Sequence, residues 1–218
     1  MPIMNYIKNR RELDNFFTEE YYNSINYSDY TLRKQKYKST AEDIVKYFFN
    51  KSVKDGHKEE YSILDYGCAI GMLLDGIRDK IPHASLAGYD ISQWAIDNPV
   101  SDGLSLTNDP SILLKSHNLT IALDVFEHMF DVDLVGLLDQ LNTHKLLVRI
   151  PVKCNSDQTN DFHLEVSRRD RSHVNCKTKG EWIDFIEDQG YQYISSLNLP
   201  TIYDAKGCFC GYFYKIKH

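Results

Sequence analysis

The sequence of 218 residues contains no apolar run close to the ~20 residues that a membrane-spanning helix needs. Its five cysteines are odd in number and irregularly spaced, so they do not suggest a disulfide framework. Positive charge is also scarce, with 25 Lys and Arg against 31 Asp and Glu and a formal net charge of −6. General nucleic-acid binding depends on clustered basic residues. We therefore expect a reduced, cytoplasmic protein without a membrane segment and without general affinity for nucleic acids.

The length suits one α/β domain with a short N-terminal appendage. Residues 1–40 are polar and rich in tyrosine, and we predict that they form a helical cap. Residues 41–218 are predicted to form a single domain. Ser39 is followed by Glu42 and Asp43, which predicts that a helix begins at this point because acids are favoured in a first turn.

Short apolar segments typical of strands alternate with helical patterns through most of the chain. The predicted strands are 61–67, 84–92, 104–107, 119–124, 145–152, 191–199 and 208–217. This alternation is typical of a mostly parallel, doubly wound sheet covered on both faces, with the last two strands forming an antiparallel pair. Residues 153–178 are predicted to be a long loop that is either functional or mobile, because structureless loops of that length are uncommon in compact domains.

The stretch ILDYGCAIGMLLDGI, residues 63–77, places two glycines between a strand and a helix. Gly67 and Gly71 let a ligand approach the backbone, and the start of the helix offers free N–H groups. A dinucleotide-binding turn would carry a third glycine where Ala69 stands. The turn by itself fits a nucleotide-binding loop and a plain tight turn equally well.

Acidic residues lie at the ends of three predicted strands. Asp65, Asp90 and Asp124 occupy these positions, and Glu127 follows shortly after the last of them. Ligands of open α/β sheets bind beyond the carboxyl ends of the strands, where an acid such as Asp90 can accept both hydroxyls of a ribose. The three acids together favour a nucleotide-containing ligand over a plain tight turn.

With these motifs, the chain resembles the class I S-adenosylmethionine-dependent methyltransferases over most of residues 20–218. LDYGCAIG resembles their first motif, GYDIS the acidic loop after the second strand, and ALDVFEHM the D-x-x-E-H segment after the fourth. The N-terminal EEYYNSINYSDYTLRKQKY resembles the cap of some glycan and small-molecule methyltransferases. The resemblance implies a Rossmann-like, seven-stranded sheet with an antiparallel last strand, and methyl transfer from S-adenosylmethionine.

The resemblance also implies which residues bind the cofactor. The expected set is Asp65, Gly67, Cys68, Ala69, Gly71, Asp90, Ile91, Asp124 and Tyr30. The turn would wrap the methionine part, Asp65 would approach the amino group, Asp90 would bind the ribose, and Ile91 would flank the adenine. Ala69 is a mild departure from the usual glycine if its φ is negative. The cap tyrosines would form a lid or belong to the core, and they are Tyr21, Tyr22, Tyr27, Tyr30 and Tyr37.

O-methylation requires alignment of a hydroxyl with the methyl carbon and removal of the hydroxyl proton. Histidines and acids that could remove it lie at the fourth-strand edge and in the long loop, namely His128, His163, Glu165, Asp170 and His173. We predict His173 as the general base, with Asp170 orienting it and His128 as a further catalytic candidate; a structural role is the alternative for each. The resemblance favours a sugar, a glycan or another small polar molecule as acceptor.

Two other functions stay open. Glu127, His128 and His173, with Asp124, offer oxygen and nitrogen ligands suited to Mg²⁺ or Mn²⁺. This pattern resembles small-RNA 3′-end 2′-O-methyltransferases, but D-x-x-E-H also occurs in metal-free relatives, and an acidic chain disfavours RNA, so no metal is favoured. The chain could also be a catalytically silent partner-binding module, or one domain of a larger glycan-modifying protein.

Overall fold

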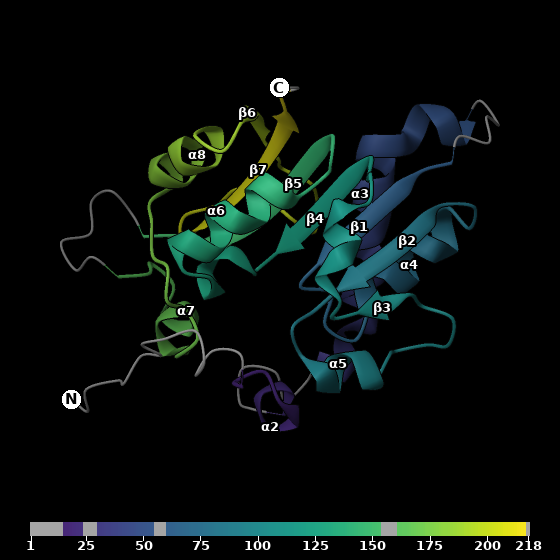
Figure 1. Ribbon diagram of the computed structural model, residues 1–218, viewed down its shortest axis with the longest axis horizontal. Helices are drawn as coiled ribbons and strands as arrows, with labels where there is room; N and C mark the ends of the chain where they lie inside the picture. The colour runs from purple at the N-terminus through teal and green to yellow at the C-terminus, as the bar shows by residue number, and fades with distance from the viewer. Residues whose placement is uncertain (1–14, 24–29, 55–59, 154–160, 217–218) are drawn as a thin grey trace.

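A seven-stranded sheet runs through the middle of the molecule, with helices on both of its faces (Figure 1). The computed structural model describes residues 15–23, 30–54, 60–153 and 161–216, with the backbone only at 30, 31 and 50–54. The strands are β1 (Ser62–Tyr66), β2 (Ser85–Tyr89), β3 (Leu106–Thr107), β4 (Leu119–Leu123), β5 (Lys145–Pro151), β6 (Tyr191–Ser196) and β7 (Cys208–Lys215). Each of them lies within a predicted strand.

The α-helices of the described residues are α2 (Glu19–Tyr22), α3 (Lys34–Lys54), α4 (Met72–Lys80), α5 (Gln93–Asp97), α6 (Asp131–Gln140), α7 (Glu165–Arg169) and α8 (Lys179–Glu187). Three short 3₁₀ turns complete the set, η1 (Tyr30–Arg33), η2 (Pro110–Leu114) and η3 (Phe126–His128). The segment predicted as a long loop therefore contains one short helix, α7. Within the described ranges, no helix is both long and apolar enough to cross a membrane.

The strand order is β3-β2-β1-β4-β5-β7-β6. The first five strands pair in parallel, and β7 runs antiparallel to both β5 and β6. Parallel neighbours require a crossover connection, and helices supply it here, whereas residues 197–207 join the antiparallel strands β6 and β7 without a helix. The predicted Rossmann-like fold with an antiparallel last strand is confirmed.

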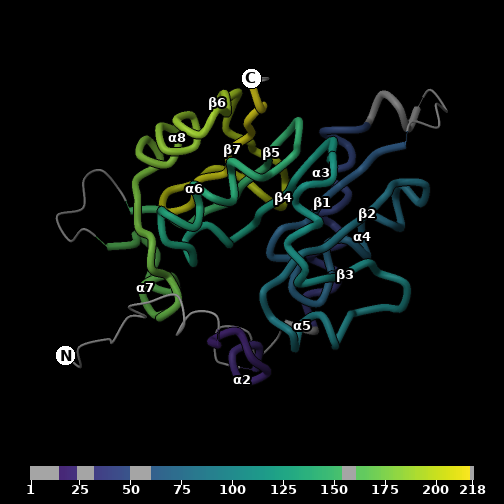
Figure 2. The backbone as a smooth tube through the Cα atoms, viewed as in Figure 1, coloured from purple at the N-terminus to yellow at the C-terminus, as the bar shows by residue number. Residues whose placement is uncertain are grey.

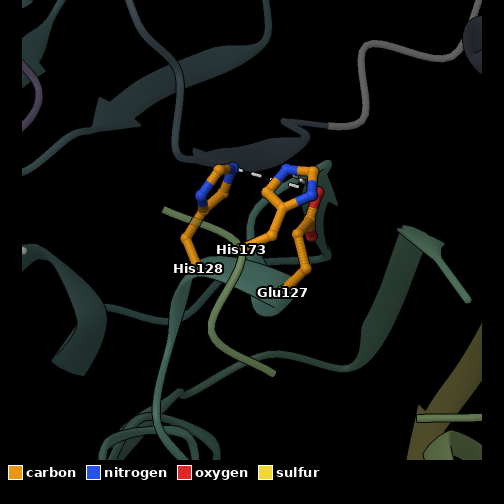
Figure 3. Close-up of side chains that lie close together, drawn as sticks. All are labelled: Glu127, His128 and His173. Atoms are coloured by element: carbon orange, nitrogen blue, oxygen red, sulfur yellow. Dashed lines mark ion pairs between the residues drawn. The ribbon is translucent and has the colours of Figure 1, made fainter. Parts of the chain in front are cut away.

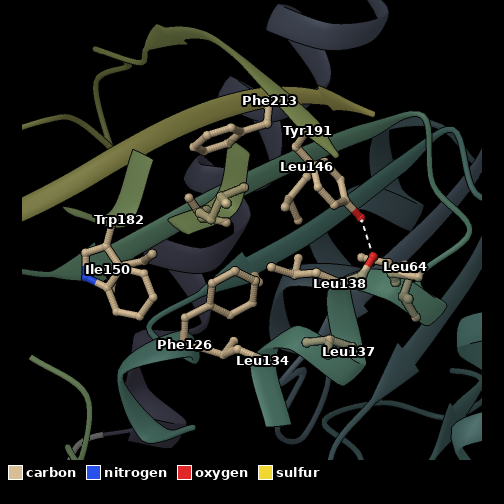
Figure 4. Packing of buried hydrophobic residues seen from close by; sticks show 14 of the residues in the cluster. Leu64, Phe126, Leu134, Leu137, Leu138, Leu146, Ile150, Trp182, Tyr191 and Phe213 are labelled. Carbon is tan, nitrogen blue, oxygen red and sulfur yellow. Dashed lines mark hydrogen bonds between the residues drawn. The ribbon is translucent and has the colours of Figure 1, made fainter. Parts of the chain in front are cut away.

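Two hydrophobic layers hold the sheet between its helices. On one face, α6 and α8 pack over β4, β5 and β7, with Phe126, Trp182 and Phe213 fully buried between them (Figure 4). In the same layer the Tyr191 hydroxyl donates a hydrogen bond to the carbonyl of Leu138 at 3.3 Å. On the other face, α3 and α4 pack over β1 and β4. These layers fix the strands, and therefore the positions of the side chains at the strand ends.

Helix α3 begins earlier than the sequence predicts. It begins at Lys34 rather than at Ser39, and it continues through residue 40, where the cap was expected to end. Its first turns are held by α4, because Lys34 pairs with Asp75 at 3.1 Å and Lys38 with Asp79 at 2.8 Å. The first turns of α3 thus meet α4 through contacts between segments that lie far apart in the sequence.

Candidate active site

The loops that follow β1, β2 and β4 meet at one edge of the sheet, where α2, α5 and α7 also gather (Figures 1 and 2). A cavity opens at this edge, as expected for the carboxyl ends of parallel strands. Its lining comprises Phe17, Tyr21, Tyr22, Tyr37, Tyr66, Gly67, Ala69, Tyr89, Asp90, Ile91, Leu123, Asp124, Val125, His128, Met129 and Asp133.

The turn between β1 and α4 has a left-handed backbone at three positions. The φ angles are +78° at Gly67, +48° at Ala69 and +82° at Gly71. A Cβ at Gly67 would lie 2.4 Å from Val125 Cγ2, so only glycine fits there. The condition under which Ala69 would be a mild departure, a negative φ, is therefore not met. The Ala69 N–H donates a 2.7 Å hydrogen bond to Asp90 Oδ2, which helps to hold this conformation. The left-handed conformation costs an alanine roughly 1–2 kcal/mol.

The N–H groups of this turn bond within the protein. Those of Gly67 and Cys68 both donate to the Tyr89 carbonyl, at 2.7 and 3.1 Å, and that of Gly71 donates to the Cys68 carbonyl at 2.9 Å. These three positions precede α4, whereas the free N–H groups expected from the sequence are those of the first turn of the helix, which begins at Met72. Gly67 and Ala69 contribute surface to the cavity, while Cys68 and Gly71 lie outside its lining.

Asp90 fastens the turn to the end of β2. Its Oδ2 accepts the Ala69 N–H, and its Oδ1 accepts the Ser92 N–H at 2.9 Å. Burial raises the pKa of this carboxyl. Each carboxylate oxygen has a second lone pair, so Asp90 can still accept hydroxyls from a ligand in the cavity that it lines. Its neighbour Ile91 also lines the cavity and is 41% exposed.

Asp65 lies buried at the end of β1, outside the lining of the cavity. Burial, and after it the charge of Asp90, raise the pKa of Asp65 to about 7. The folded protein therefore holds this proton up to about pH 7, whereas the unfolded chain releases it near pH 4. Between these values, a rising pH lowers the contribution of Asp65 to stability.

Replacing Asp65 with asparagine removes this titration. We compare the free energies of unfolding of Asp65→Asn and the native protein. The variant should gain stability relative to the native protein as the pH rises from 4 to 7. The gain should be roughly 2–4 kcal/mol, since each pKa unit corresponds to about 1.4 kcal/mol. Urea unfolding of both proteins at several pH values measures the difference. A difference that does not depend on pH would contradict the assignment.

Asp124 follows β4 and faces the cavity, but it has a partner inside the protein. It adopts φ +58°, and its two carboxylate oxygens accept hydrogen bonds from Arg149 Nε, at 2.9 Å, and Arg149 Nη2. Although desolvation opposes ionisation, this guanidinium holds the pKa of Asp124 below its ordinary value. Asp124 is therefore an ionised residue of the cavity lining that is hydrogen-bonded to Arg149 in β5.

Three predicted site residues lie close together at the wall of the cavity, and one of them, His128, is part of its lining (Figure 3). Glu127 Oε1 lies 3.8 Å from His173 Nε2 and 3.9 Å from His128 Nε2. The centres of the two imidazole rings are 4.6 Å apart. Glu127 is completely buried, and both of its carboxylate oxygens lack a hydrogen-bond partner, as does Nδ1 of each histidine. Such buried groups are costly unless a proton, a metal ion or a ligand satisfies them.

Burial shifts the pKa of every group in this cluster toward its neutral form. Burial, and then the charge of Asp124, raise the pKa of Glu127 well above its ordinary value. Burial and the neighbouring His173 lower the pKa of His128 to about 4. The pKa of His173 is lowered by burial, against the opposing effect of Asp170. At neutral pH both imidazoles are uncharged and able to accept a proton.

Residues 170–175 are hydrogen-bonded to η3, the 3₁₀ turn that follows β4. The Glu127 carbonyl accepts the N–H groups of Val174 and Asn175, at 2.9 and 3.0 Å. Asp170 Oδ1 accepts the N–H of Ser172 at 3.0 Å and its hydroxyl at 2.5 Å, and Oδ2 lies 3.9 Å from His173 Nε2. Burial raises the pKa of Asp170, but the two histidines and these hydrogen bonds outweigh it and leave the pKa lowered. Asp170 is thus an ionised neighbour of the histidine pair.

An aromatic roof, defined here as residues 16–22, covers the cavity. Tyr22 stacks on Trp94 with ring centres 5.0 Å apart, and Phe17 meets His128 edge-on at 5.4 Å. Tyr21 and Tyr37 also line the cavity, which supports the lid interpretation for part of the predicted cap. Tyr27 and the side chain of Tyr30 lie outside the described residues.

The structure brings some of the predicted residues to the cavity and leaves others away from it. His128 lines the cavity, whereas His173 and Asp170 lie next to His128 but outside the lining. Glu165 is exposed and pairs with Arg169, and the His163 side chain packs near Gly207. The sequence reasoning missed Phe17, Tyr66, Tyr89, Leu123, Val125, Met129 and Asp133 in the lining.

Tyr66 and Tyr89 had a signal in the sequence, because each directly precedes a predicted site residue at a strand end. Their rings stack with centres 5.1 Å apart, and the Tyr66 hydroxyl lies 3.8 Å from Met129 Sδ.

No protein-family model matches the chain, and no curated protein matches its sequence. Solved structures do match its fold. The mitomycin 7-O-methyltransferase MmcR has a TM-score of 0.64 at 12% identity, covering 94% of this chain and 60% of its own. The magnesium protoporphyrin IX methyltransferase ChlM from Synechocystis PCC 6803, determined with bound S-adenosylmethionine, has a TM-score of 0.59 at 14% identity, covering 96% of this chain and 100% of its own.

A methyltransferase from Clostridium acetobutylicum ATCC 824 has a TM-score of 0.60 at 12% identity, with 90% of this chain and 96% of that enzyme covered. This chain spans 60% of the mitomycin enzyme and 56% of an O-methyltransferase-like protein from Nostoc punctiforme PCC 73102. At such identities the matches establish the fold. The chain has the fold of the S-adenosylmethionine-dependent methyltransferases.

Proposed function

We propose that this protein transfers a methyl group from S-adenosylmethionine to a hydroxyl of a small polar acceptor, such as a sugar. The observation that carries the proposal is one shared cavity. The glycine turn fastened by Asp90 forms one side of it, and His128, in contact with His173, forms another. A cofactor-sized ligand at the turn and a proton acceptor would therefore face the same space.

The cofactor would supply an electrophilic methyl group, and the protein would align the acceptor and remove its proton. His128 is the member of the buried cluster that lines the cavity, and it is uncharged at neutral pH because its pKa is about 4. We assign the contact with the acceptor hydroxyl to His128. Asp170, close behind it, would stabilise the positive charge that His128 gains, because its carboxylate favours the protonated imidazole.

The lining argues for an acceptor without negative charge. The lining residues of the cavity within the described chain include three acids, Asp90, Asp124 and Asp133, and no Lys or Arg. Its aromatic side chains can stack on a sugar ring or an aromatic ring. An RNA end would bring phosphates to acidic walls, which disfavours the RNA-end alternative.

Calorimetric titration with S-adenosylhomocysteine tests the first half of the proposal, with an expected Kd near 1–10 μM, or about −7 to −8 kcal/mol. A screen of neutral sugars and phenols with labelled methyl donor tests the second half, and we expect label on an oxygen. Absence of binding heat would refute the proposal. Binding without turnover on any acceptor would instead favour the silent binding module.

A metal-assisted version of the reaction is supported by the unsatisfied atoms of the buried cluster. One carboxylate and two imidazoles whose ligating atoms lie within 4.8 Å of one another suit a divalent ion such as Mn²⁺ or Zn²⁺. Glu127, His128 and His173 would hold it, whereas Asp124 is engaged by Arg149. Running the same screen with EDTA and with added metals separates the two versions. Activity abolished by EDTA and restored by one metal would support the metal-assisted reaction.

A further inference from the structure

Tyr21 is the residue of the roof whose hydroxyl reaches Asp170, the ionised neighbour of the buried cluster. Its side chain is 9% exposed, and its ring meets Phe17 edge-on at 4.9 Å and Tyr22 at 5.4 Å. Its hydroxyl donates a hydrogen bond of 3.3 Å to Asp170 Oδ2 across 149 positions of sequence. The side chain thus joins the N-terminal segment to the turn that carries His173.

On the cofactor side, the roof is fastened to the loop after β2. The Ser92 hydroxyl donates to the Phe17 carbonyl, and the Ser92 N–H donates to Asp90 Oδ1. The Tyr22 ring stacks on Trp94 in α5. Any ligand that orders the Asp90 loop therefore also orders the roof.

On the other side, the two oxygens of Asp170 have different partners. Oδ1 accepts both hydrogen bonds from Ser172. Oδ2 accepts the Tyr21 hydroxyl and lies 3.9 Å from His173 Nε2. Tyr21 thus holds the carboxylate oxygen that faces the histidine. Hydrogen bonds to ionised groups are stronger than those between neutral groups, so this contact can fix the orientation of the carboxylate.

We propose that Tyr21 is a positioning residue that couples closure of the roof to the orientation of Asp170 and, through it, of His173. The inference rests on the proposed function of the cavity as a cofactor site. Cofactor binding orders the Asp90 loop and the roof, and the Tyr21 hydroxyl then completes the histidine cluster. The cofactor consequently binds before the acceptor.

The test compares Tyr21→Phe with a matched control, Tyr203→Phe, in which the same hydroxyl is removed from a tyrosine that is 52% exposed and lies outside the cavity lining. The probe is S-adenosylhomocysteine, and amide hydrogen exchange is followed at residues 17–23 and 170–175. In the native protein we expect the probe to slow exchange in both segments. In Tyr21→Phe the roof is still protected, but the probe-induced protection at Ser172 falls about tenfold, the effect of one lost hydrogen bond to a charged group. Tyr203→Phe retains protection in both segments.

With an acceptor from the screen, Tyr21→Phe should lower kcat about tenfold and leave KM for S-adenosylmethionine unchanged. Loss of a residue that only stabilised the fold would not lower kcat while leaving KM unchanged. It would also not reduce protection at residues 170–175 while leaving residues 17–23 protected. Protection at residues 170–175 that persists in Tyr21→Phe overturns the inference and leaves the proposed function intact. A native protein that binds no probe refutes the proposed function, and the inference with it.

Discussion

Asp90→Asn is expected to abolish cofactor binding. Asp90 receives two backbone N–H donors, one on each carboxylate oxygen, from Ala69 and Ser92. Asparagine must turn its own NH₂ toward one of them, so a buried donor would face another donor. The left-handed backbone at Ala69 would then lose the bond that holds it. We expect the Kd for S-adenosylhomocysteine to rise at least about 100-fold, which corresponds to roughly 2.7 kcal/mol.

The matched control is Asp97→Asn on α5, where the same change of charge occurs on an exposed side chain. Its Kd should stay within about twofold of the native value, as expected of a surface substitution far from such contacts. Thermal unfolding of both variants separates loss of binding from loss of fold. Unchanged affinity in a folded Asp90→Asn protein would show that the ligand does not use this turn.

The sheet could be predicted because each strand carries its own local signals. Apolar residues fill the strands, and acids or glycines mark their ends, as at Asp65, Gly67 and Asp90. Helix boundaries were harder to predict where distant partners decide them. Helix α3 begins at Lys34 rather than at Ser39, and its first turns contact α4 through ion pairs from Lys34 and Lys38 that no pattern around Ser39 reveals.

The site could be predicted as a set of residues but not as an arrangement. The motif D-x-x-E-H and a downstream histidine were sufficient to name Glu127, His128 and His173. Which histidine faces the cavity depends on how residues 170–175 dock against the Glu127 carbonyl, a contact between segments far apart in sequence. The roof depends on Phe17 and Tyr21, whose partners also lie far along the chain.

His128→Ala is expected to remove nearly all turnover while cofactor binding persists. His128 is the imidazole that lines the cavity, and the turn and Asp90, which would bind the cofactor, are unchanged in the variant. Loss of a general base costs typically 10²–10⁴-fold, so we expect kcat to fall by about that factor. The Kd for S-adenosylhomocysteine should stay within about threefold, because His128 forms only one part of the lining. Steady-state rates and calorimetry on the same preparation measure both.

Added imidazole distinguishes a lost base from a lost structural contact in this variant. A small base that enters the space left by His128 should restore part of the rate, whereas a displaced backbone would not be repaired. His83→Ala, at an exposed position before β2, is the matched control and should keep full activity with no response to imidazole. If His128→Ala is fully active but His173→Ala is not, the base is His173, and residues 170–175 must move toward the cavity when the acceptor binds. If both variants are active, proton removal does not involve this cluster, and its unsatisfied atoms would have to be explained by a metal ion or by the protonation of Glu127.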